Sequence, residues 1–294
     1  MKIPVAIQLG RVSNLPTVWT NTLAGVALAG GEPFSLATLL AAIGLSLLYV
    51  AGMYLNDAFD REIDAKERPL RPIPSGRIAA DTAFAAGVFM LLGGIAIVTL
   101  AEWTQVSEPV DRGMAAIAAL ALSAAIVFYD WHHKGNFLSP FFMGLCRVLA
   151  YVTAGYVVAS SIKPALLTAA FVSLSYLIGL TYVAKQEAFD RLERLWPLVF
   201  LSAPLFYAAT LLGWPTGGVL PVLFLLLTAW IGMALYFVAR RRAGDVPRAV
   251  ISLIAGIALV DAIFLAGIGH SGAASAAVLC FVITLLLQKW VSGT

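Results

Sequence analysis

Long apolar runs, broken at short intervals by charge, glycine or proline, limit what this chain can fold into. Runs of about twenty apolar residues match the thickness of the hydrocarbon core of a bilayer. Hydrophobic residues make up 61% of the 294 residues and charged residues only 12%, whereas a soluble domain carries about a quarter charged residues. One soluble core could not bury so much apolar surface. The sequence therefore predicts an all-α, polytopic membrane protein.

Ten segments are apolar enough and long enough to be membrane helices. Only GIGHSG separates the last two, so nine spans is the alternative. The start of the chain lacks a compact apolar stretch before a small-residue cleavage site, so we expect the first segment to be retained as a span. We expect a single domain over residues 1–294. The segments lie near residues 14–31, 36–56, 80–101, 113–130, 139–160, 164–185, 196–213, 218–239, 248–268 and 272–290.

Lysine and arginine are concentrated on alternate connections. One side carries only Arg112 and Lys163. The positive-inside rule predicts that the opposite side is cytoplasmic, with both termini there if the chain has ten spans. The formal net charge is only +3, so this bias indicates topology and not nucleic-acid binding. The predicted cytoplasmic bases are Lys2, Arg11, Arg61, Lys66, Arg68, Arg71, Arg77, Lys134, Lys185, Arg191, Arg194, Arg240, Arg241, Arg242, Arg248 and Lys289.

A charged segment after the second apolar run has an echo further along the chain. The string NDAFDR at residues 56–61 is followed 130 residues later by QEAFDR at residues 186–191. Both strings follow an apolar run on the same predicted side. The repeat predicts two pseudo-equivalent halves, about residues 10–130 and 131–294, each placing acids at the cytoplasmic end of a helix.

The acids of both strings have helical spacing. Asp57, Asp60 and Asp64 fall on one face of a helix, as do Glu187 and Asp190. Carboxylates packed so closely repel one another by about 1 kcal/mol per pair even in water. A hard divalent cation would compensate, because Mg²⁺ is usually held by one or two carboxylates plus phosphate oxygens and water. Two facing acidic groups could hold two ions around a diphosphate.

Basic residues accompany these acids, and arginine suits bidentate phosphate contact. Arg77, Arg191 and the run 240–242 have a simpler explanation, as solvated residues that only enforce topology. The bases expected near the diphosphate are Arg11, Arg68, Arg71, Lys134, Arg147 and Lys185.

The segment NDAFDREIDAKERPLRPIPSG, residues 56–76, resembles the first aspartate-rich motif of the UbiA superfamily of intramembrane prenyltransferases. GRVSNLPTVWTNTLAG at 10–25 is similar to the family's N-terminal helix, and YDWHHKGNFLSPFFMGLCRVLAYVTAG at 129–155 to its Tyr-x-x-x-x-Lys loop and Arg-bearing helix. TYVAKQEAFDRLERL at 181–195 occupies the place of the second acidic motif. The resemblance covers about residues 10–195.

The second motif departs from the family pattern. Gln186 follows Lys185 where the family usually has Asp, and Arg194 stands where the first repeat has Asp64. The second acidic group is therefore sparse, which puts a second metal ion in question. A tenth helix is also a departure, because the family has nine. The pattern most resembles the divergent EboC-like subgroup, found in gene clusters for exported secondary metabolites.

The resemblance implies an enzyme that joins the prenyl group of an isoprenoid diphosphate to an acceptor, often aromatic or otherwise lipophilic. It implies an Mg²⁺ cofactor and a site facing the cytoplasm in the cytoplasmic membrane. Tyr49, Tyr54, Tyr129 and Tyr182 could stabilise an allylic cation. The implied catalytic residues are Asp57, Asp60, Asp64, Lys134 and Asp190; the metal ligands Asp57, Asp60, Asp64, Glu187 and Asp190; the substrate-binding residues Arg11, Asn21, Asn56, Arg68, Arg71, Tyr129, Arg147, Tyr182 and Lys185.

Several polar residues have two interpretations. Asn21 could contact the diphosphate or form an interhelical hydrogen bond. Asp130 and Lys134 are spaced for an ordinary ion pair, and the pair His132-His133 is expected to be solvated. Asp261, in the middle of an apolar run, could contact the acceptor or bond a neighbouring helix.

Three other functions remain open: a non-catalytic carrier or export partner that binds prenyl diphosphate, a membrane terpene cyclase, and a secondary transporter. The sparse second acidic group motivates the carrier. Two related halves suit a transporter, but the intact first motif does not.

Overall fold

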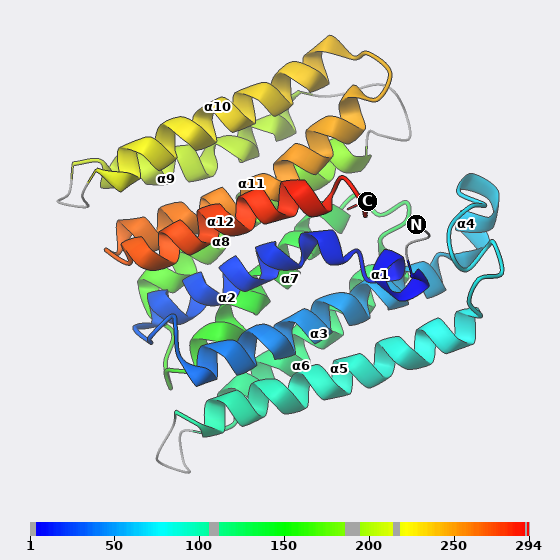
Figure 1. Ribbon diagram of the computed structural model, residues 1–294, viewed down its shortest axis with the longest axis horizontal. Helices are drawn as coiled ribbons and strands as arrows, with labels where there is room; N and C mark the ends of the chain where they lie inside the picture. The colour runs from blue at the N-terminus through cyan, green and yellow to red at the C-terminus, as the bar shows by residue number, and fades with distance from the viewer. Residues whose placement is uncertain (1–3, 106–111, 186–194, 214–217, 292, 294) are drawn as a thin grey trace.

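The computed structural model describes residues 4–105, 112–185, 195–213, 218–291 and 293, and over these residues the chain is helical with no strand (Figure 1). Each of the ten predicted segments overlaps a described helix. The elements are α1 (Val5–Leu9), η1 (Val12–Asn14), α2 (Leu15–Ala29), α3 (Leu36–Phe59), α4 (Arg61–Glu67), α5 (Ala80–Trp103), α6 (Met114–His132), α7 (Ser139–Tyr156), α8 (Pro164–Lys185), η4 (Trp196–Ser202), α9 (Ala203–Leu211), α10 (Val219–Arg240), α11 (Asp245–Gly267) and α12 (Ser271–Leu287).

Six of the described helices, α3, α5, α6, α8, α10 and α11, are long and apolar enough to cross a membrane. The segments 196–211 and 271–287 are apolar but shorter. Large apolar side chains stay exposed on the outer helices, with Phe89 77% and Phe206 70% accessible. Such a surface suits lipid and not water. The all-helical membrane architecture is confirmed, whereas a total of nine or ten crossings stays a prediction.

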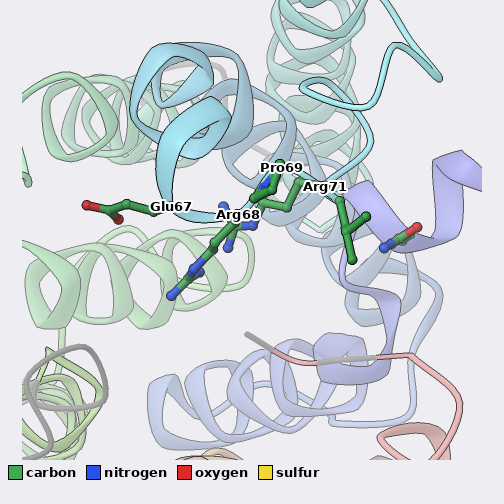
Figure 2. A pocket seen from close by; sticks show the side chains of 6 residues that line it. Glu67, Arg68, Pro69 and Arg71 are labelled. Atoms are coloured by element: carbon green, nitrogen blue, oxygen red, sulfur yellow. The ribbon is translucent and has the colours of Figure 1, made fainter.

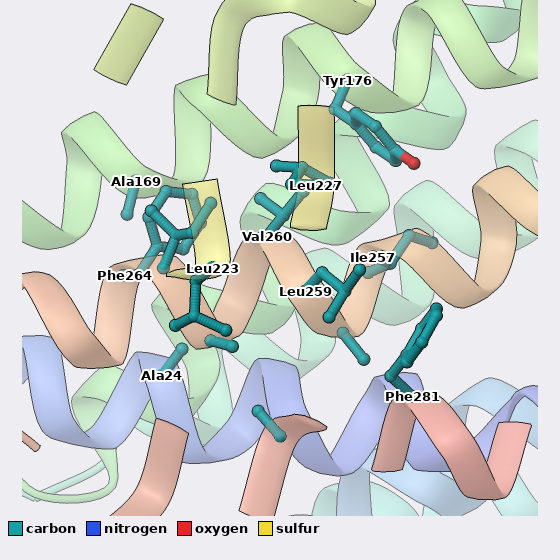
Figure 3. Close-up of a cluster of buried hydrophobic side chains, with 14 of the residues drawn as sticks. Ala24, Ala169, Tyr176, Leu223, Leu227, Ile257, Leu259, Val260, Phe264 and Phe281 are labelled. Atoms are coloured by element: carbon teal, nitrogen blue, oxygen red, sulfur yellow. The ribbon is translucent and has the colours of Figure 1, made fainter. Parts of the chain in front are cut away.

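Helix α11 lies at the centre of the larger hydrophobic core. Its most apolar window is 89% buried, compared with 28% for α5 and for α10. Figure 3 shows Val260 and Phe264 of α11 among Leu223 and Leu227 of α10 and Tyr176 of α8. A second core joins α3, α5 and α6, and residues of α2 and α7 belong to both cores. The prediction of two pseudo-equivalent halves stays a prediction.

Local signals in the sequence set several helix ends. The Ser35 hydroxyl accepts a hydrogen bond from the Thr38 amide at 3.2 Å and begins α3. Gly30 takes a left-handed conformation with φ of 92° and ends α2. Glu102, fully buried near the end of α5, accepts from the amides of Gly113 and Ala115 and so caps α6.

Close packing of α3 against α5 holds the end of α3 in place. A Cβ atom built on Gly44 would lie 2.9 Å from the Gly94 carbonyl oxygen, and one on Gly94 would lie 2.9 Å from the Gly44 carbonyl oxygen. Only glycine allows this approach, as is common between membrane helices. At the far end of α3, the helix α4 and both chain termini lie at the same end of the bundle (Figure 1).

Candidate functional site

The three aspartates of the first motif gather where α3 gives way to α4. Asp57, Asp60 and Asp64 are only 5%, 4% and 1% exposed. The predicted single stripe on one continuous helix is wrong, because α3 ends at Phe59 and α4 begins at Arg61. Asp60, with ψ of 0°, interrupts the helical backbone between them. We call Asp57, Asp60 and Asp64 the acidic cluster.

Two arginines from different segments neutralise part of the acidic cluster. Arg11 Nη2 lies 3.1 Å from Asp57 Oδ1. Arg71 Nη1 lies 2.7 Å from Asp64 Oδ2 and 3.4 Å from Asp57 Oδ1. The chain therefore supplies positive charge of its own that offsets part of the carboxylate repulsion.

Arg11 reaches the acidic cluster from a sparsely populated backbone conformation. Its φ of 41° and ψ of 48° are left-handed, and together with Gly10 it joins α1 to η1. A non-glycine residue in this region carries strain on the order of 1 kcal/mol. The strained residue thus carries one of the two guanidinium groups that pair with Asp57.

Asp60 faces a different pair of bases. His133 Nε2 and Lys134 Nζ each lie 3.4 Å from Asp60 Oδ2. Burial alone would raise the pKa of the Asp60 carboxyl, but hydrogen bonds and charge from His133 and Lys134 hold that pKa below its usual value. The expectation that His133 is solvated is wrong, since its side chain is only 13% exposed. In the sequence, only the position of His133 directly before Lys134 could have indicated its contact with Asp60.

Asp130 does not pair with Lys134, which corrects a second expectation. Lys134 lies beyond the end of α6 and turns toward Asp60. Asp130, still on α6, instead accepts a hydrogen bond from Asn56 Nδ2 at 3.3 Å. The ring of Tyr129 stacks on His133 with 5.0 Å between ring centroids, so this predicted substrate-binding tyrosine lies beside the acidic cluster.

The described end of the second motif lies at the same end of the bundle. Lys185 Nζ, at the last position of α8, donates to the Asn136 carbonyl at 2.6 Å. Asn136 belongs to the connection that also carries Lys134, the partner of Asp60. Glu187 and Asp190, the predicted metal ligands of the second motif, lie outside the described residues, together with Gln186, Arg191, Glu193 and Arg194.

An open cavity of about 360 Å³ adjoins the acidic cluster on the side of α1. Arg71 belongs both to this cavity and to the ion pairs of Asp57 and Asp64. Figure 2 shows the side chains of Glu67, the last residue of α4, and of Arg68, which follows it. Arg77 Nη1 donates to Gln8 Oε1 at 3.0 Å beside the cavity. The lining residues are Gln8, Glu67, Arg68, Pro69, Leu70 and Arg71.

Arg147, a predicted diphosphate ligand, lies in a buried network deeper in the bundle. Its Nη2 donates to the Thr17 carbonyl at 2.7 Å and to Asp261 Oδ2 at 3.3 Å. The hydroxyls of Tyr151 and Thr20 also donate to Asp261. Asp261 therefore bonds α11 to α2 and α7, which is the structural one of its two interpretations.

The remaining predicted residues have varied surroundings. Asn21 on α2 is fully buried, and within the described residues neither atom of its amide has a hydrogen-bond partner, so the interhelical bond, one of its two interpretations, is absent there. Tyr182 lies partly buried on α8, one turn before Lys185. Tyr49 accepts from Asn14, and Tyr54 donates to the Ala6 carbonyl. Stabilisation of a cation by these rings stays a prediction.

Comparison with known proteins gives one family. The model of the UbiA prenyltransferase family matches residues 18–257. The digeranylgeranylglyceryl phosphate synthase of Methanopyrus kandleri is 32% identical over 147 residues, which is 48% of this chain and 49% of that protein. The enzyme of the same name from Sulfolobus acidocaldarius is 27% identical over 170 residues, covering 50% and 62%. The chain thus spans about half the length of the curated relatives it matches.

Solved structures agree on the fold. A UbiA homolog from Aeropyrum pernix K1 superposes with a TM-score of 0.60 at 16% identity, covering 87% of this chain and 96% of that one. A digeranylgeranylglyceryl phosphate synthase structure gives a TM-score of 0.52 at 20% identity, covering 96% and 95%. With a family match across most of its length, the first acidic motif and the shared helical architecture, this chain belongs to the UbiA prenyltransferase family.

Proposed function

We propose that this protein is an Mg²⁺-dependent intramembrane prenyltransferase that transfers the prenyl group of an isoprenoid diphosphate to a lipophilic acceptor. The observation that carries the proposal is the buried acidic cluster beside Arg11, Arg71 and Lys134, at one end of an apolar helical bundle. Buried charge is costly unless it serves a partner. The family match over residues 18–257 supports the same reading.

The residues of the acidic cluster fit a magnesium ion by their chemistry. They offer buried carboxylate oxygens, and Asp64 Oδ1 has no hydrogen-bond partner among the described residues. No three acidic, histidine or cysteine side chains in that part of the chain converge on one point. An Mg²⁺ ion at this site would take its remaining ligands from phosphate oxygens and water. When bound, Mg²⁺ would neutralise charge on the departing diphosphate. The proposed ligands are Asn56, Asp57, Asp60 and Asp64, with Glu187 and Asp190 for a second ion.

The bases of the site would bind the diphosphate once substrate is present. Arg11 and Arg71 now pair with carboxylates. A cation held by those carboxylates would leave the guanidinium groups to bind diphosphate oxygens, for which their fork of donors is suited. Arg68, Lys134 and Lys185 lie around the same end of the bundle and add positive charge. These groups stabilise the negative charge that grows on the leaving oxygen as the C–O bond stretches.

The apolar bundle protects the reactive allylic cation from water. Tyr129, beside the acidic cluster, and Tyr182 on α8 would present their π faces to that cation. Arg147 and Asn21 lie on α7 and α2 and are buried. We assign Asn21 to the apolar interior that would hold the prenyl and acceptor chains. We assign Arg147 a structural role there, through its contact with Asp261.

For the acceptor, we propose a lipid with an anionic head group. The relatives carry the name digeranylgeranylglyceryl phosphate synthase, which names a prenylated glycerol phosphate. A phosphate head group would suit the cavity beside Arg68 and Arg71. The aromatic acceptor expected from the sequence is the alternative. We also propose that the acidic cluster faces the cytoplasm, because the lysines and arginines favour that side.

Purified protein should be incubated with radiolabelled isoprenoid diphosphates of several lengths and with either a glycerophosphate lipid or an aromatic acceptor, with and without EDTA. We expect release of diphosphate and a prenylated glycerophosphate lipid, both abolished by EDTA. A prenylated aromatic product would replace the proposed acceptor. Binding without consumption under every condition would identify a carrier, and a cyclised hydrocarbon formed without acceptor would identify a cyclase. The double variant Glu187→Gln with Asp190→Asn tests the second ion.

A further inference from the structure

Asp130 lies outside the acidic motifs, yet its surroundings tie it to the acidic cluster. Asp130 is only 4% exposed. Its Oδ1 accepts from Asn56 Nδ2 at 3.3 Å, and Asn56 directly precedes Asp57. His133 makes a second link, because its Nδ1 lies 3.2 Å from the Asp130 carbonyl oxygen while its Nε2 lies 3.4 Å from Asp60 Oδ2.

Two buried carboxylates outside the acidic cluster, Asp261 and Glu102, have a partner on each oxygen. Asp261 receives Tyr151 on one oxygen and both Thr20 and Arg147 on the other. Glu102 receives one backbone amide on each oxygen. These arrangements satisfy the buried charge locally. They show what a carboxylate with a purely structural task looks like in this protein.

Asp130 lacks the full set of partners that Asp261 and Glu102 have. Its single donor is a neutral amide, and the structure shows no ion pair to it among the described residues. Its Oδ2 is buried and without a partner. Only one other buried carboxylate oxygen in the described part of the chain is also unpartnered, and it is Asp64 Oδ1, in the acidic cluster. A buried carboxylate left in this state is destabilising unless a cation completes it.

We propose that Asp130 is a further ligand of the divalent-cation site, with Oδ2 as the donor atom. This inference rests on the proposed function for the identity of the substrate but concerns a residue that neither acidic motif contains. The contact with Asn56 supports it, because an amide whose nitrogen is bound to Asp130 leaves its oxygen for the cation. As a ligand from α6, Asp130 would add one carboxylate to the few that the sparse second motif offers.

The first test measures cation binding without substrate. Mn²⁺ binding to the purified full chain in detergent is followed by electron paramagnetic resonance for wild type, Asp130→Asn and Asp81→Asn. Asp81 is a matched control because it is exposed in the first turn of α5 and the substitution removes the same charge. We expect Asp130→Asn to weaken Mn²⁺ binding at least about tenfold, with Asp81→Asn unchanged. Wild-type affinity in Asp130→Asn, or no Mn²⁺ binding by wild type, overturns the proposal.

The second test uses the sign of a stability change. Without metal, Asp130→Asn should raise the melting temperature by on the order of 2 °C or more, because it removes an uncompensated buried charge. Added Mn²⁺ should raise the melting temperature of wild type and Asp81→Asn but not of Asp130→Asn. A lower melting temperature in Asp130→Asn with an intact Mn²⁺ response would make Asp130 a structural residue. Failure of the proposed function appears separately, as Mn²⁺ binding by a wild type that consumes no prenyl diphosphate.

Discussion

Two buried groups of carboxylates and arginines in this protein differ in how fully their carboxylate oxygens are hydrogen-bonded. In the network around Asp261, three donors from α2 and α7 satisfy both carboxylate oxygens. In the acidic cluster, Arg71 is shared between Asp57 and Asp64, and Asp64 Oδ1 has no partner in the described residues. The first group lies inside the bundle, and the second adjoins an open cavity. Residue types alone do not distinguish the two groups, but the carboxylate oxygens do: both are hydrogen-bonded in Asp261, and one is left without a partner in Asp64.

The sharpest test of this contrast is Asp57→Ala, which should abolish catalysis without unfolding the protein. We expect release of diphosphate to fall by at least about a hundredfold, because charge stabilisation at the leaving group is lost. Arg71 keeps its 2.7 Å contact with Asp64, so the fold should persist. Turnover is measured with labelled prenyl diphosphate, and circular dichroism checks the fold. Undiminished turnover would remove Asp57 from the site.

Asp261→Ala should produce the converse result. It leaves Arg147 buried without its carboxylate partner, and breaking such a buried pair costs about 3–5 kcal/mol. We therefore expect a large fall in melting temperature in detergent, with Asp261→Asn affected less because its oxygen still accepts hydrogen bonds. If Asp261→Ala melted like wild type but lost turnover for one acceptor only, the residue would belong to the acceptor site instead.

A smaller effect is expected for Arg68 and Arg77, two arginines between α4 and α5, which should differ in their contribution to substrate binding. Arg68 lines the cavity, whereas Arg77, among the described residues, donates to Gln8, Ser75 and the Leu70 carbonyl. Arg68→Ala should raise KM for the prenyl diphosphate or the anionic acceptor about tenfold, by losing a charged contact. Arg77→Ala should stay within about twofold. Steady-state kinetics with each substrate varied in turn show which of the two Arg68 binds, and equal effects of both changes would contradict a specific role for Arg68.

The smallest expected effect concerns pH. Because His133 and Lys134 lower the pKa of Asp60, ionised Asp60 contributes stability above the ordinary carboxyl pKa, and this contribution is lost as pH falls through the lowered value. His133→Ala should raise the pKa of Asp60, so the loss should begin at a higher pH. Melting temperature against pH for wild type and His133→Ala measures this shift. Coincident acid limbs would show that His133 does not hold the Asp60 charge.

The sequence by itself determined the class of protein and the place of one acidic group. Apolar runs of about twenty residues require a bilayer, and every one of the ten predicted segments overlaps a described helix. The string NDAFDREID predicted a cation site because closely spaced carboxylates need compensation, and this site stays a proposal. These inferences depend on neighbours in sequence, whose spacing along a helix is known before folding.

Only the tertiary structure decided which partners these charges take. Arg11 and Asp57 are 46 residues apart, Asn56 and Asp130 are 74 apart, and Thr20 and Asp261 are 241 apart. No local spacing predicts such pairs, because they form where α2, α3, α6 and α11 pack. The sequence did not reveal the interruption at Asp60 either, and in the structure Asp60 pairs with His133 and Lys134 while Asp57 and Asp64 share Arg71. Helix periodicity comes from the backbone, whereas the pairing of buried charges comes from how whole helices pack.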